Sequence, residues 1–389
     1  MHKFSVAASL FLFLLASCGK KEANSNPQDE LLQLNQIQVI ASHNSYRKHT
    51  SPNVFAFLVG NASALPSAYD PSALDYDHVN FDEQMTTYGI RGLEIDVYND
   101  PKGGDFYNRR INIFCSLPEE SGEKTLLQPG FKVLHIKDVD YNTHYLTFKQ
   151  SLWAVRNWSE AHPNHLPLFI NIETKQDAPG DNSQLAGAGF AKAIKWDQAA
   201  AEALDVEVKA VFGNELEKVI TPDRIRNGAA TLNEVVLQKK WPKLKDCRGK
   251  VVFIMQGKAV SYYLNGHPNL EERAIFVYGE PGSSETAFVI LNDASGDKDT
   301  ITQRVKEGYI VRTRSDADTK QARNGDYTDA MAAFASGAQI ISTDYYRPDP
   351  RSDTGTTWTK FMVKLPVGDR GRKNPVSAAQ VQVAEALVE

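Results

Sequence analysis

Six polar side chains in the first half of the chain have the chemistry of a metal site combined with acid–base groups. They comprise two imidazoles, one amide and three carboxylates: His43, Asn44, Glu94, Asp96, His135 and Glu173. Three carboxylates in an apolar surrounding would repel one another and raise each other's pKa, so a bound cation is the natural resolution. Because the amide and the carboxylates offer only oxygen, they suit a hard ion, Ca²⁺ first and Mg²⁺ second, whereas zinc would recruit the imidazoles. The two histidines then remain for proton transfer near neutral pH, a combination that fits phosphoryl chemistry.

Short runs rich in Val, Ile and Phe are the elements that could position these side chains. Their nearly continuous apolar character indicates strands buried on both faces of a parallel sheet. Eight runs fit this description, at residues 38–43, 92–98, 131–137, 166–175, 250–256, 273–279, 309–315 and 338–346. A further run at residues 287–293 could displace one of them, so the strand assignment near residues 270–295 is open. Helical patterns lie between the runs, for example over residues 143–163 and 326–337.

Eight strands with helices interposed favour a single α/β domain, a (β/α)8 TIM-type barrel, over an open doubly wound sheet. No glycine-rich phosphate loop follows the first predicted strand, which excludes the dinucleotide-binding version of the open sheet. In such barrels the active site forms at the C-terminal ends of the strands. The segments at residues 47–80 and 99–130 would be long loops above this mouth.

The six polar side chains are spaced so that they would meet at the mouth. The first predicted strand ends in the histidine–asparagine pair, and Glu94 and Asp96, two residues apart on the second strand, share one face. His135 and Glu173 lie near the ends of the third and fourth strands. A single histidine at a strand end is more often a capping or core residue, and an acidic pair can be a solvated strand face. Recurrence at four consecutive strand ends favours a site over both alternatives.

Four motifs, in this order along the chain, resemble the catalytic barrel of calcium-dependent phosphoinositide-specific phospholipase C, and most closely its secreted bacterial members. The motifs are SHNSY at residues 42–46, RGLEIDVY at 91–98, VLHIKD at 133–138 and INIETK at 170–175. The resemblance covers roughly residues 35 to 350. It implies that the catalytic residues are His43 and His135. The calcium ligands implied by the resemblance are Asn44, Glu94, Asp96 and Glu173.

The resemblance also implies a reaction. Such enzymes cleave phosphatidylinositol by attack of the inositol 2-hydroxyl on phosphorus, which gives diacylglycerol and an inositol cyclic phosphate. Calcium would bind the 2-hydroxyl and a phosphate oxygen, His43 would stabilise the phosphorane, and His135 would protonate the leaving glycerol oxygen. Either His43 or a carboxylate that binds the metal could take the proton of the 2-hydroxyl.

Three further residues are candidates for substrate binding. Lys175 lies two residues after Glu173 on the same strand face, so it could hold a phosphate or an inositol hydroxyl. Arg314 and Tyr345 lie near later strand ends and could line the inositol ring. Surface or packing roles are the alternatives for all three.

Two other functions remain in competition with this interpretation. A glycerophosphodiester phosphodiesterase shares the barrel, a Glu-x-Asp pair and two histidines. Its first strand usually ends in His-Arg-Gly, whereas this chain has His43-Asn44-Ser45. The second alternative is a surface lipoprotein that binds inositol headgroups or glycans without turnover.

The N-terminus has the layout of a secretory signal, with a short basic start, an apolar run over residues 4–15 and a small-residue cleavage site. The motif LASC at residues 15–18 resembles a bacterial lipobox, which would make Cys18 a lipid acceptor; ordinary secretion is the alternative. We therefore predict a signal peptide at 1–17, a flexible tether at 18–34 and the phosphodiesterase barrel at 35–389. The expected location is the cell envelope or surface, on a membrane reached through the lipid anchor.

Composition narrows the choice of partners. The chain has 389 residues and a formal net charge of -5, so it shows no basic excess for nucleic acid, and we expect a monomer that binds a phosphoinositide or related phospholipid. Three cysteines cannot build a disulfide framework. Whether Cys115 and Cys247 pair with each other is open at this stage.

Overall fold

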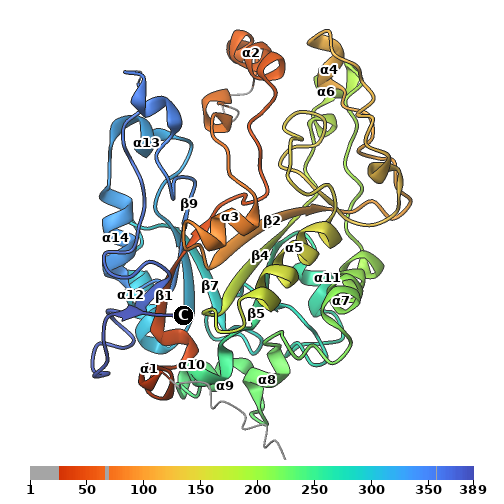
Figure 1. Cartoon of the computed structure of the whole chain (residues 1–389). Coiled ribbons are helices and arrows are strands. Elements are labelled where there is room, and N and C mark those ends of the chain that lie inside the picture. Colours follow the sequence, from red (N-terminus) through yellow and green to blue (C-terminus); the bar gives the residue numbers. More distant parts are fainter. Residues whose placement is uncertain (1–25, 66–69, 356) are drawn as a thin grey trace, which may run out of the picture.

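A computed structural model describes residues 26–65, 70–355 and 357–389. Eight parallel strands form the wall of a barrel (Figure 1). A parallel bridge between Tyr278 and Phe288 joins the two ends of the sheet, so the barrel closes. The strands follow one another around the barrel in the order β6 (Phe276–Val277), β5 (Val251–Gly257), β4 (Leu168–Lys175), β2 (Gly92–Tyr98), β1 (Ile37–Ser42), β9 (Ile340–Thr343), β8 (Ile310–Arg314) and β7 (Phe288–Asp293). The predicted (β/α)8 barrel is confirmed.

One of the eight predicted strands is wrong. Within residues 131–137 only β3 (Lys132–Val133) is a strand, and it pairs antiparallel with β2 outside the barrel wall. Its place in the barrel belongs to β7, which is the competing run at residues 287–293. Both runs have an apolar side-chain pattern suited to a buried strand, so local sequence could not separate them. His135 therefore follows a short antiparallel strand and does not end a barrel strand.

Helices surround the barrel and begin and end where the sequence supplies signals. In α5 (Phe148–Ala161), Thr147 caps the first turn by accepting a hydrogen bond from the Gln150 amide at 3.2 Å, and Phe148, Leu152 and Val155 are buried, as the helical pattern predicted. Gly337, with φ of 83°, ends α14 (Thr328–Ser336). The other helices are α1 (Pro27–Leu31), α2 (Pro52–Gly60), α3 (Phe81–Thr86), α4 (Ile111–Phe114), α6 (Ser183–Gly187), α7 (Gln198–Phe212), α8 (Pro222–Arg226), α9 (Leu232–Leu237), α10 (Leu244–Cys247), α11 (Val260–Leu264), α12 (Lys298–Glu307) and α13 (Lys320–Asn324).

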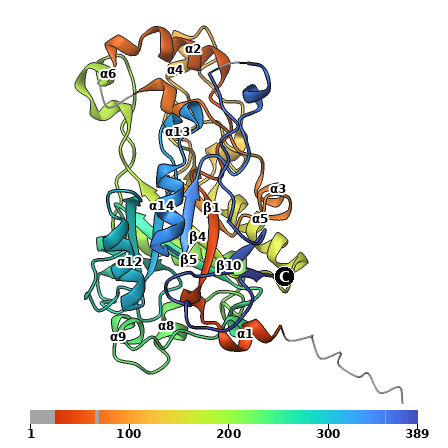
Figure 2. The ribbon, with the colours of Figure 1, turned by 90° about the vertical axis from the view of Figure 1, so that its left-hand side faces the viewer.

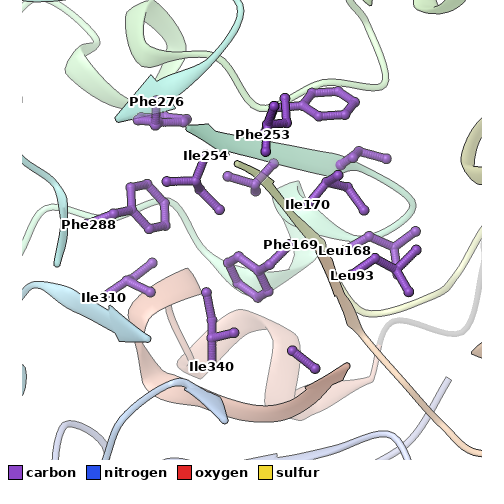
Figure 3. Close-up of a cluster of buried hydrophobic side chains, with 14 of the residues drawn as sticks. Leu93, Leu168, Phe169, Ile170, Phe253, Ile254, Phe276, Phe288, Ile310 and Ile340 are labelled. Carbon is purple, nitrogen blue, oxygen red and sulfur yellow. The ribbon is translucent and has the colours of Figure 1, made fainter. Parts of the chain in front are cut away.

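The barrel interior is packed with apolar side chains. Phe169, Ile254, Phe288 and Ile340 come from different strands and point toward one another inside the wall (Figure 3). A cavity of only about 10 Å³ remains beside them, which is room for about one water molecule. The barrel is therefore a solid support, and chemistry is confined to its mouth.

The segment before the first strand packs against the closed end of the barrel. Asp29 of α1 is paired with Arg248 at 2.6 Å and is buried, and Leu32 and Leu34 are buried in the core. The predicted tether at residues 18–34 is therefore too long at its C-terminal end, because residues 27–34 are part of the folded unit. Residues 18–25, with Cys18, lie outside the described residues.

Two further short strands pair outside the barrel wall, and two cysteines lie among the described residues. β10 (Gly371–Lys373) pairs antiparallel with β1 and with β11 (Ala386–Leu387). Cys115 and Cys247 are both free thiols, so the open question of their pairing is answered. Among the described residues, no helix combines the length and the apolar character needed to cross a bilayer.

The long loops after β1, β2 and β4 carry α2, α4 and α6, which stand together at one end of the molecule (Figures 1 and 2). Because these loops leave the C-terminal ends of parallel strands, this end is the mouth of the barrel. Helices α1 and α8 lie at the opposite end in both views.

Candidate active site

Two neighbouring strands bring the three predicted carboxylates together. In the parallel pairing of β2 with β4, Asp96 lies opposite Glu173, and Glu94 lies two residues earlier on β2. One oxygen from each of Glu94, Asp96 and Glu173 lies within 4.8 Å of the others. Strand register thus produces the cluster that the spacing predicted.

The cluster has the properties expected of a cation site. Burial raises the pKa of Asp96 well above its usual range, and the charges of Glu173 and Glu94 raise it further, while Lys175 opposes them. Neither carboxylate oxygen of Asp96 has a hydrogen-bond partner of good geometry among the described residues. A divalent cation would satisfy these oxygens and restore their ionised form, so the residues present fit Ca²⁺.

Lys175 supplies positive charge to the same cluster. Its ammonium lies 3.3 Å from Oδ2 of Asp96 and 3.4 Å from Oε1 of Glu173. These carboxylates raise the pKa of Lys175, against the effect of burial. The structure thus places Lys175 among the predicted metal ligands, and its contact with substrate stays a prediction.

Asn44 occupies a backbone conformation that few residue types tolerate. Its φ of 48° lies in the left-handed region, where Asn is enriched over most non-glycine residues. Its Nδ2 donates to the Tyr76 hydroxyl at 3.1 Å, which fixes the amide orientation. The side chain is buried, and its Oδ1 oxygen, 3.5 Å from the Tyr46 hydroxyl, is the atom that could reach a cation.

His43 is held by a carboxylate and an arginine from neighbouring strands, and we call this set the wall triad: His43, Asp344 and Arg314. Nδ1 of His43 lies 2.9 Å from Oδ1 of Asp344, whose Oδ2 accepts a hydrogen bond from Nη2 of Arg314 at 3.0 Å. Burial holds the pKa of His43 well below its usual value, and Arg314 lowers it further. Because Nδ1 is engaged and the side chain is 18% exposed, Nε2 is the nitrogen available to a substrate. Arg314 lies in the site, and its predicted contact with the inositol ring stays untested.

His135 is held in the same manner by residues of the loops, and we call this set the loop triad: His135, Asp140 and Arg47. Nδ1 of His135 lies 2.9 Å from Oδ2 of Asp140, which also accepts a hydrogen bond from Nε of Arg47 at 2.7 Å. Thr50 donates to the other Asp140 oxygen at 2.7 Å. Burial lowers the pKa of His135 below its usual value, and the hydrogen bond and charge of Asp140 offset only part of this effect. The side chain is 20% exposed, so its Nε2 too can reach a substrate.

The family model described as phosphoinositide phospholipase C, Ca²⁺-dependent, matches residues 32–375. The chain belongs to this family. It is therefore an enzyme, a phosphodiesterase of the phospholipase C type, and Ca²⁺ is the cofactor of its family. The family assignment confirms the main interpretation of the sequence and leaves the glycerophosphodiester alternative weaker.

Solved structures with a similar chain path are distant in sequence. A calcium-dependent phosphoinositol-specific phospholipase C from a Pseudomonas species is 17% identical, with a TM-score of 0.49 over 82% of this chain and 92% of that one. A Ca²⁺-dependent phosphatidylinositol-specific phospholipase C from Streptomyces antibioticus is 16% identical, with a TM-score of 0.47 over 81% and 95% of the two chains. A glycerophosphoryl diester phosphodiesterase from Parabacteroides distasonis is 11% identical, with a TM-score of 0.31 over 81% and 85%. No curated protein sequence matches the chain.

Besides the partners of the two histidines in the triads, the sequence analysis missed two residues beside the carboxylate cluster. Arg312 of β8 donates from Nη2 to Oε2 of Glu94 at 2.5 Å, and its side chain is buried. Nε2 of Gln256, near the end of β5, lies 3.4 Å from Oε1 of Glu94 and 3.2 Å from Oε2 of Glu173. A signal was present, because Arg312 lies two residues before Arg314 and so shares its strand face.

Tyr345 has a different environment from the other candidates. Tyr345 is 3% exposed, and its ring packs against Trp358 and Phe361 with centroid distances of 6.0 and 6.1 Å. Its contacts are thus those of a core residue in the enzyme, and a contact with substrate stays a prediction.

Proposed function

We propose that this enzyme cleaves phosphatidylinositol-type phosphodiesters to diacylglycerol and an inositol cyclic phosphate, by attack of the inositol 2-hydroxyl on phosphorus. The observation that carries the proposal is the combination of an oxygen-only carboxylate cluster with two imidazoles, each held through Nδ1 with Nε2 available. Such an arrangement offers one proton acceptor and one proton donor beside a cation site. Family membership supports the same reaction class.

Four residues would hold the metal: Asn44, Glu94, Asp96 and Glu173. When bound there, Ca²⁺ supplies positive charge that lowers the pKa of a hydroxyl group and offsets charge on the phosphate. Arg312 and Gln256 fix the orientation of Glu94 through the hydrogen bonds described above. Both residues would therefore position a metal ligand, and Arg312 would also balance part of the charge of Glu94.

The two histidines divide the proton transfers. His43, which directs Nδ1 to Asp344, would accept the proton of the 2-hydroxyl at Nε2. His135, whose Nδ1 faces the ionised Asp140, would donate a proton from Nε2 to the glycerol oxygen that leaves. Burial alone would raise the pKa of Asp140, but Arg47 and His135 outweigh it and hold that pKa well below its usual value. A permanent negative charge beside His135 favours its protonated form, as an acid requires.

Phosphorus NMR tests the reaction directly. With phosphatidylinositol and Ca²⁺, the first phosphorus product should be a five-membered cyclic phosphate, since no water takes part in that step. An analogue that lacks the 2-hydroxyl should bind but should not react. Cleavage of this analogue at a comparable rate would show that a water molecule is the nucleophile, which is the outcome that overturns the proposal.

The metal assignment has its own test. Glu173→Gln keeps the shape of the side chain and removes one negative charge, so calorimetry should show weaker Ca²⁺ binding and activity should require more Ca²⁺. Glu215→Gln, on an exposed turn away from the cluster, is the matched control and should leave both unchanged. A chelator should abolish activity, and Ca²⁺ should restore it better than Zn²⁺. Full activity in chelator would refute the assignment.

We also propose that Cys18 carries a lipid and that the enzyme is a monomer bound to the cell envelope. The support for the lipid anchor is the LASC motif and the polar residues after it. Since α1 lies at the closed end of the barrel, such an anchor would attach to the end opposite the mouth (Figure 2). Cys18→Ser should move the protein from the membrane fraction to the soluble fraction; unchanged fractionation would refute the lipid anchor.

A further inference from the structure

A basic segment covers part of the closed end of the barrel. Residues 238–250 contain six lysines and arginines and a single acidic residue, Asp246. The whole chain has the opposite balance, with 43 lysines and arginines against 48 acidic residues. Helix α10 lies in this segment, at the end of the molecule that also holds α1 and α9 (Figure 1). The closed end thus has a local charge opposite to that of the chain as a whole.

Only two of these six cations are paired, and both pair with α1. Nε of Arg248 lies 2.6 Å from Oδ2 of Asp29, and Nζ of Lys245 lies 2.8 Å from Oε2 of Glu30. The other four form no ion pair within the part of the chain that the structure describes, and neither do two lysines of neighbouring segments. We call these unpaired lysines the basic face: Lys218, Lys239, Lys240, Lys243, Lys250 and Lys306.

The fold brings the basic face together from three parts of the chain. Lys239 and Lys306 line the same cavity, which has a volume of about 140 Å³. Gly249 lies beside Lys218, because a Cβ built on this glycine would be 3.8 Å from Nζ of that lysine. Four of the six side chains are exposed and the other two are half-buried. Their charges therefore face solvent without a carboxylate to balance them.

Several unpaired lysines on one surface attract an anionic partner, and the chain before α1 indicates which partner. Helix α1 packs against α10, and the Leu244 amide donates to the Leu32 carbonyl at 2.9 Å. Only residues 18–25 separate the start of the described chain from the predicted lipid acceptor, and eight residues span at most about 29 Å. A lipid on Cys18 would therefore keep the basic face close to the bilayer that holds the lipid. An acyl chain and a basic face reinforce each other at such a surface.

We propose that the basic face binds the anionic surface of a bilayer and holds the mouth of the barrel away from that bilayer. Helices α9 and α10 lie at the end of the molecule opposite α2 and α4, which stand at the mouth (Figure 1). The attraction between lysines and anionic lipids falls off within a Debye length, about 10 Å in 0.1 M salt, so it acts only on the end that carries the lysines. A phosphoinositide would then reach the mouth from a second surface or from solution. This consequence rests on the proposed function, whereas the binding itself does not.

Binding to phosphatidylglycerol vesicles tests the inference. A chain that begins at Gly19 lacks the acceptor cysteine and retains every contact described above, because these contacts involve residues from 26 onward. It should bind phosphatidylglycerol vesicles at low salt, bind phosphatidylcholine vesicles much more weakly, and lose its binding at high salt. Binding that depends neither on salt nor on the charge of the lipid would overturn the inference.

A triple variant of this chain, with Lys239→Gln, Lys240→Gln and Lys243→Gln, locates the binding surface. Its affinity for phosphatidylglycerol vesicles should fall by about fivefold for each lysine removed. Arginine at the same three positions keeps the charge and should keep the binding. The matched control changes three exposed lysines outside the basic face: Lys102→Gln, Lys149→Gln and Lys298→Gln. The control loses the same charge, so an equal loss of binding in the control would show a dependence on net charge alone and would refute the basic face as the binding surface.

Hydrolysis separates the orientation from the binding. If the basic face holds the mouth away from the bilayer, the triple glutamine variant should hydrolyse phosphatidylinositol in phosphatidylglycerol vesicles at least as fast as the parent chain. A rate that falls in parallel with the binding would show that these lysines bring the mouth to its substrate, and the proposed orientation would be wrong. If the proposed function fails, neither protein hydrolyses phosphatidylinositol, while salt-dependent vesicle binding still reports on the basic face. Tighter binding to an oligonucleotide than to the vesicles would assign the face to another polyanion and would also overturn the inference.

Discussion

The wall triad and the loop triad hold their imidazoles in the same way but stand on different parts of the molecule. The wall triad lies at the ends of barrel strands, and its carboxylate, Asp344, has a pKa raised by burial. A second carboxyl group, Asp316, accepts a hydrogen bond from the Asp344 amide at 2.8 Å, and burial and the charge of Asp344 raise its pKa to about 6. In the loop triad the carboxylate has its pKa held low by a buried arginine. Asp344 beside His43 therefore loses its negative charge more readily than Asp140 beside His135. This difference suits His43 as a base and His135 as an acid.

Removal of each imidazole should show this difference most strongly. His135→Ala should lower activity on phosphatidylinositol by roughly 10²–10⁴-fold, because the glycerol oxygen then leaves without a proton. Much of the loss should disappear with a nitrophenol leaving group, which departs without protonation. His43→Ala should harm both substrates, since both need the 2-hydroxyl as nucleophile. Equal losses in His135→Ala on both substrates would remove the distinction between the triads.

The arginines should differ in their contribution to stability. Arg47 is fully buried and donates to Asp140, to Thr50 and to the backbone carbonyls of Leu74 and Tyr76. Arg47→Met leaves the buried Asp140 carboxylate without its arginine partner, so the free energy of unfolding should fall by about 3–5 kcal/mol.

Arg314→Met is the matched comparison for that arginine. The Arg314 side chain is 17% exposed, so its loss should lower the free energy of unfolding by less. Urea unfolding of both variants measures the difference. A larger loss in Arg314→Met would contradict the view that the loop triad depends on its arginine for structure.

The pH dependence of kcat/KM should shift when the negative charge of Asp140 is removed. Asp140 offsets part of the effect of burial on the pKa of His135, so in Asp140→Asn that pKa should fall further below its usual value. A smaller fraction of His135 is then protonated at neutral pH, and the high-pH limb of kcat/KM should move to lower pH by about one unit. A purely structural role for Asp140 predicts a lower rate at every pH with the limb in place.

Among these variants, we expect the smallest effect on stability from Asp316→Asn. Its raised pKa means that its contribution to stability is complete below about pH 4 and is lost as the pH rises through about 6. Asp316→Asn should remove this loss, so the Tm of the variant should exceed that of the parent by ~2 °C above pH 6. The two proteins should have nearly the same Tm near pH 4. A difference in Tm between the two proteins that is the same at every pH would show that Asp316 acts through packing.

Much of the barrel and of the carboxylate cluster was predictable from the sequence. Parallel strands buried on both faces have a continuous apolar pattern, and the two-residue period of a strand places Glu94 and Asp96 on one face. Because the ends of parallel strands meet at one edge, Glu173 could be added without knowledge of the register. The structure then shows Asp96 directly opposite Glu173.

The loop triad could not be predicted, for physical reasons. β3 pairs antiparallel with β2 outside the barrel wall, although its sequence has the apolar pattern of a wall strand. The bond from Arg47 to Asp140 spans 93 residues and depends on how two irregular loops fold together. Local periodicity has no information on such a contact. The sequence pattern therefore predicted His135 at the mouth but at the end of a barrel strand, and it gave no indication of Arg47.

The closure of the barrel has a consequence for its local unfolding. β6 contributes only two residues to the wall, and the bridge between Tyr278 and Phe288 joins it to β7. In the strand order this seam lies across the barrel from β1 and β2. Short pairing with few hydrogen bonds opens at low free-energy cost, so amide hydrogens at the seam should exchange with solvent before those of the opposite wall. The strands that carry the carboxylate cluster belong to the slow-exchanging side, so the barrel can open at the seam while the spacing of those carboxylates is preserved.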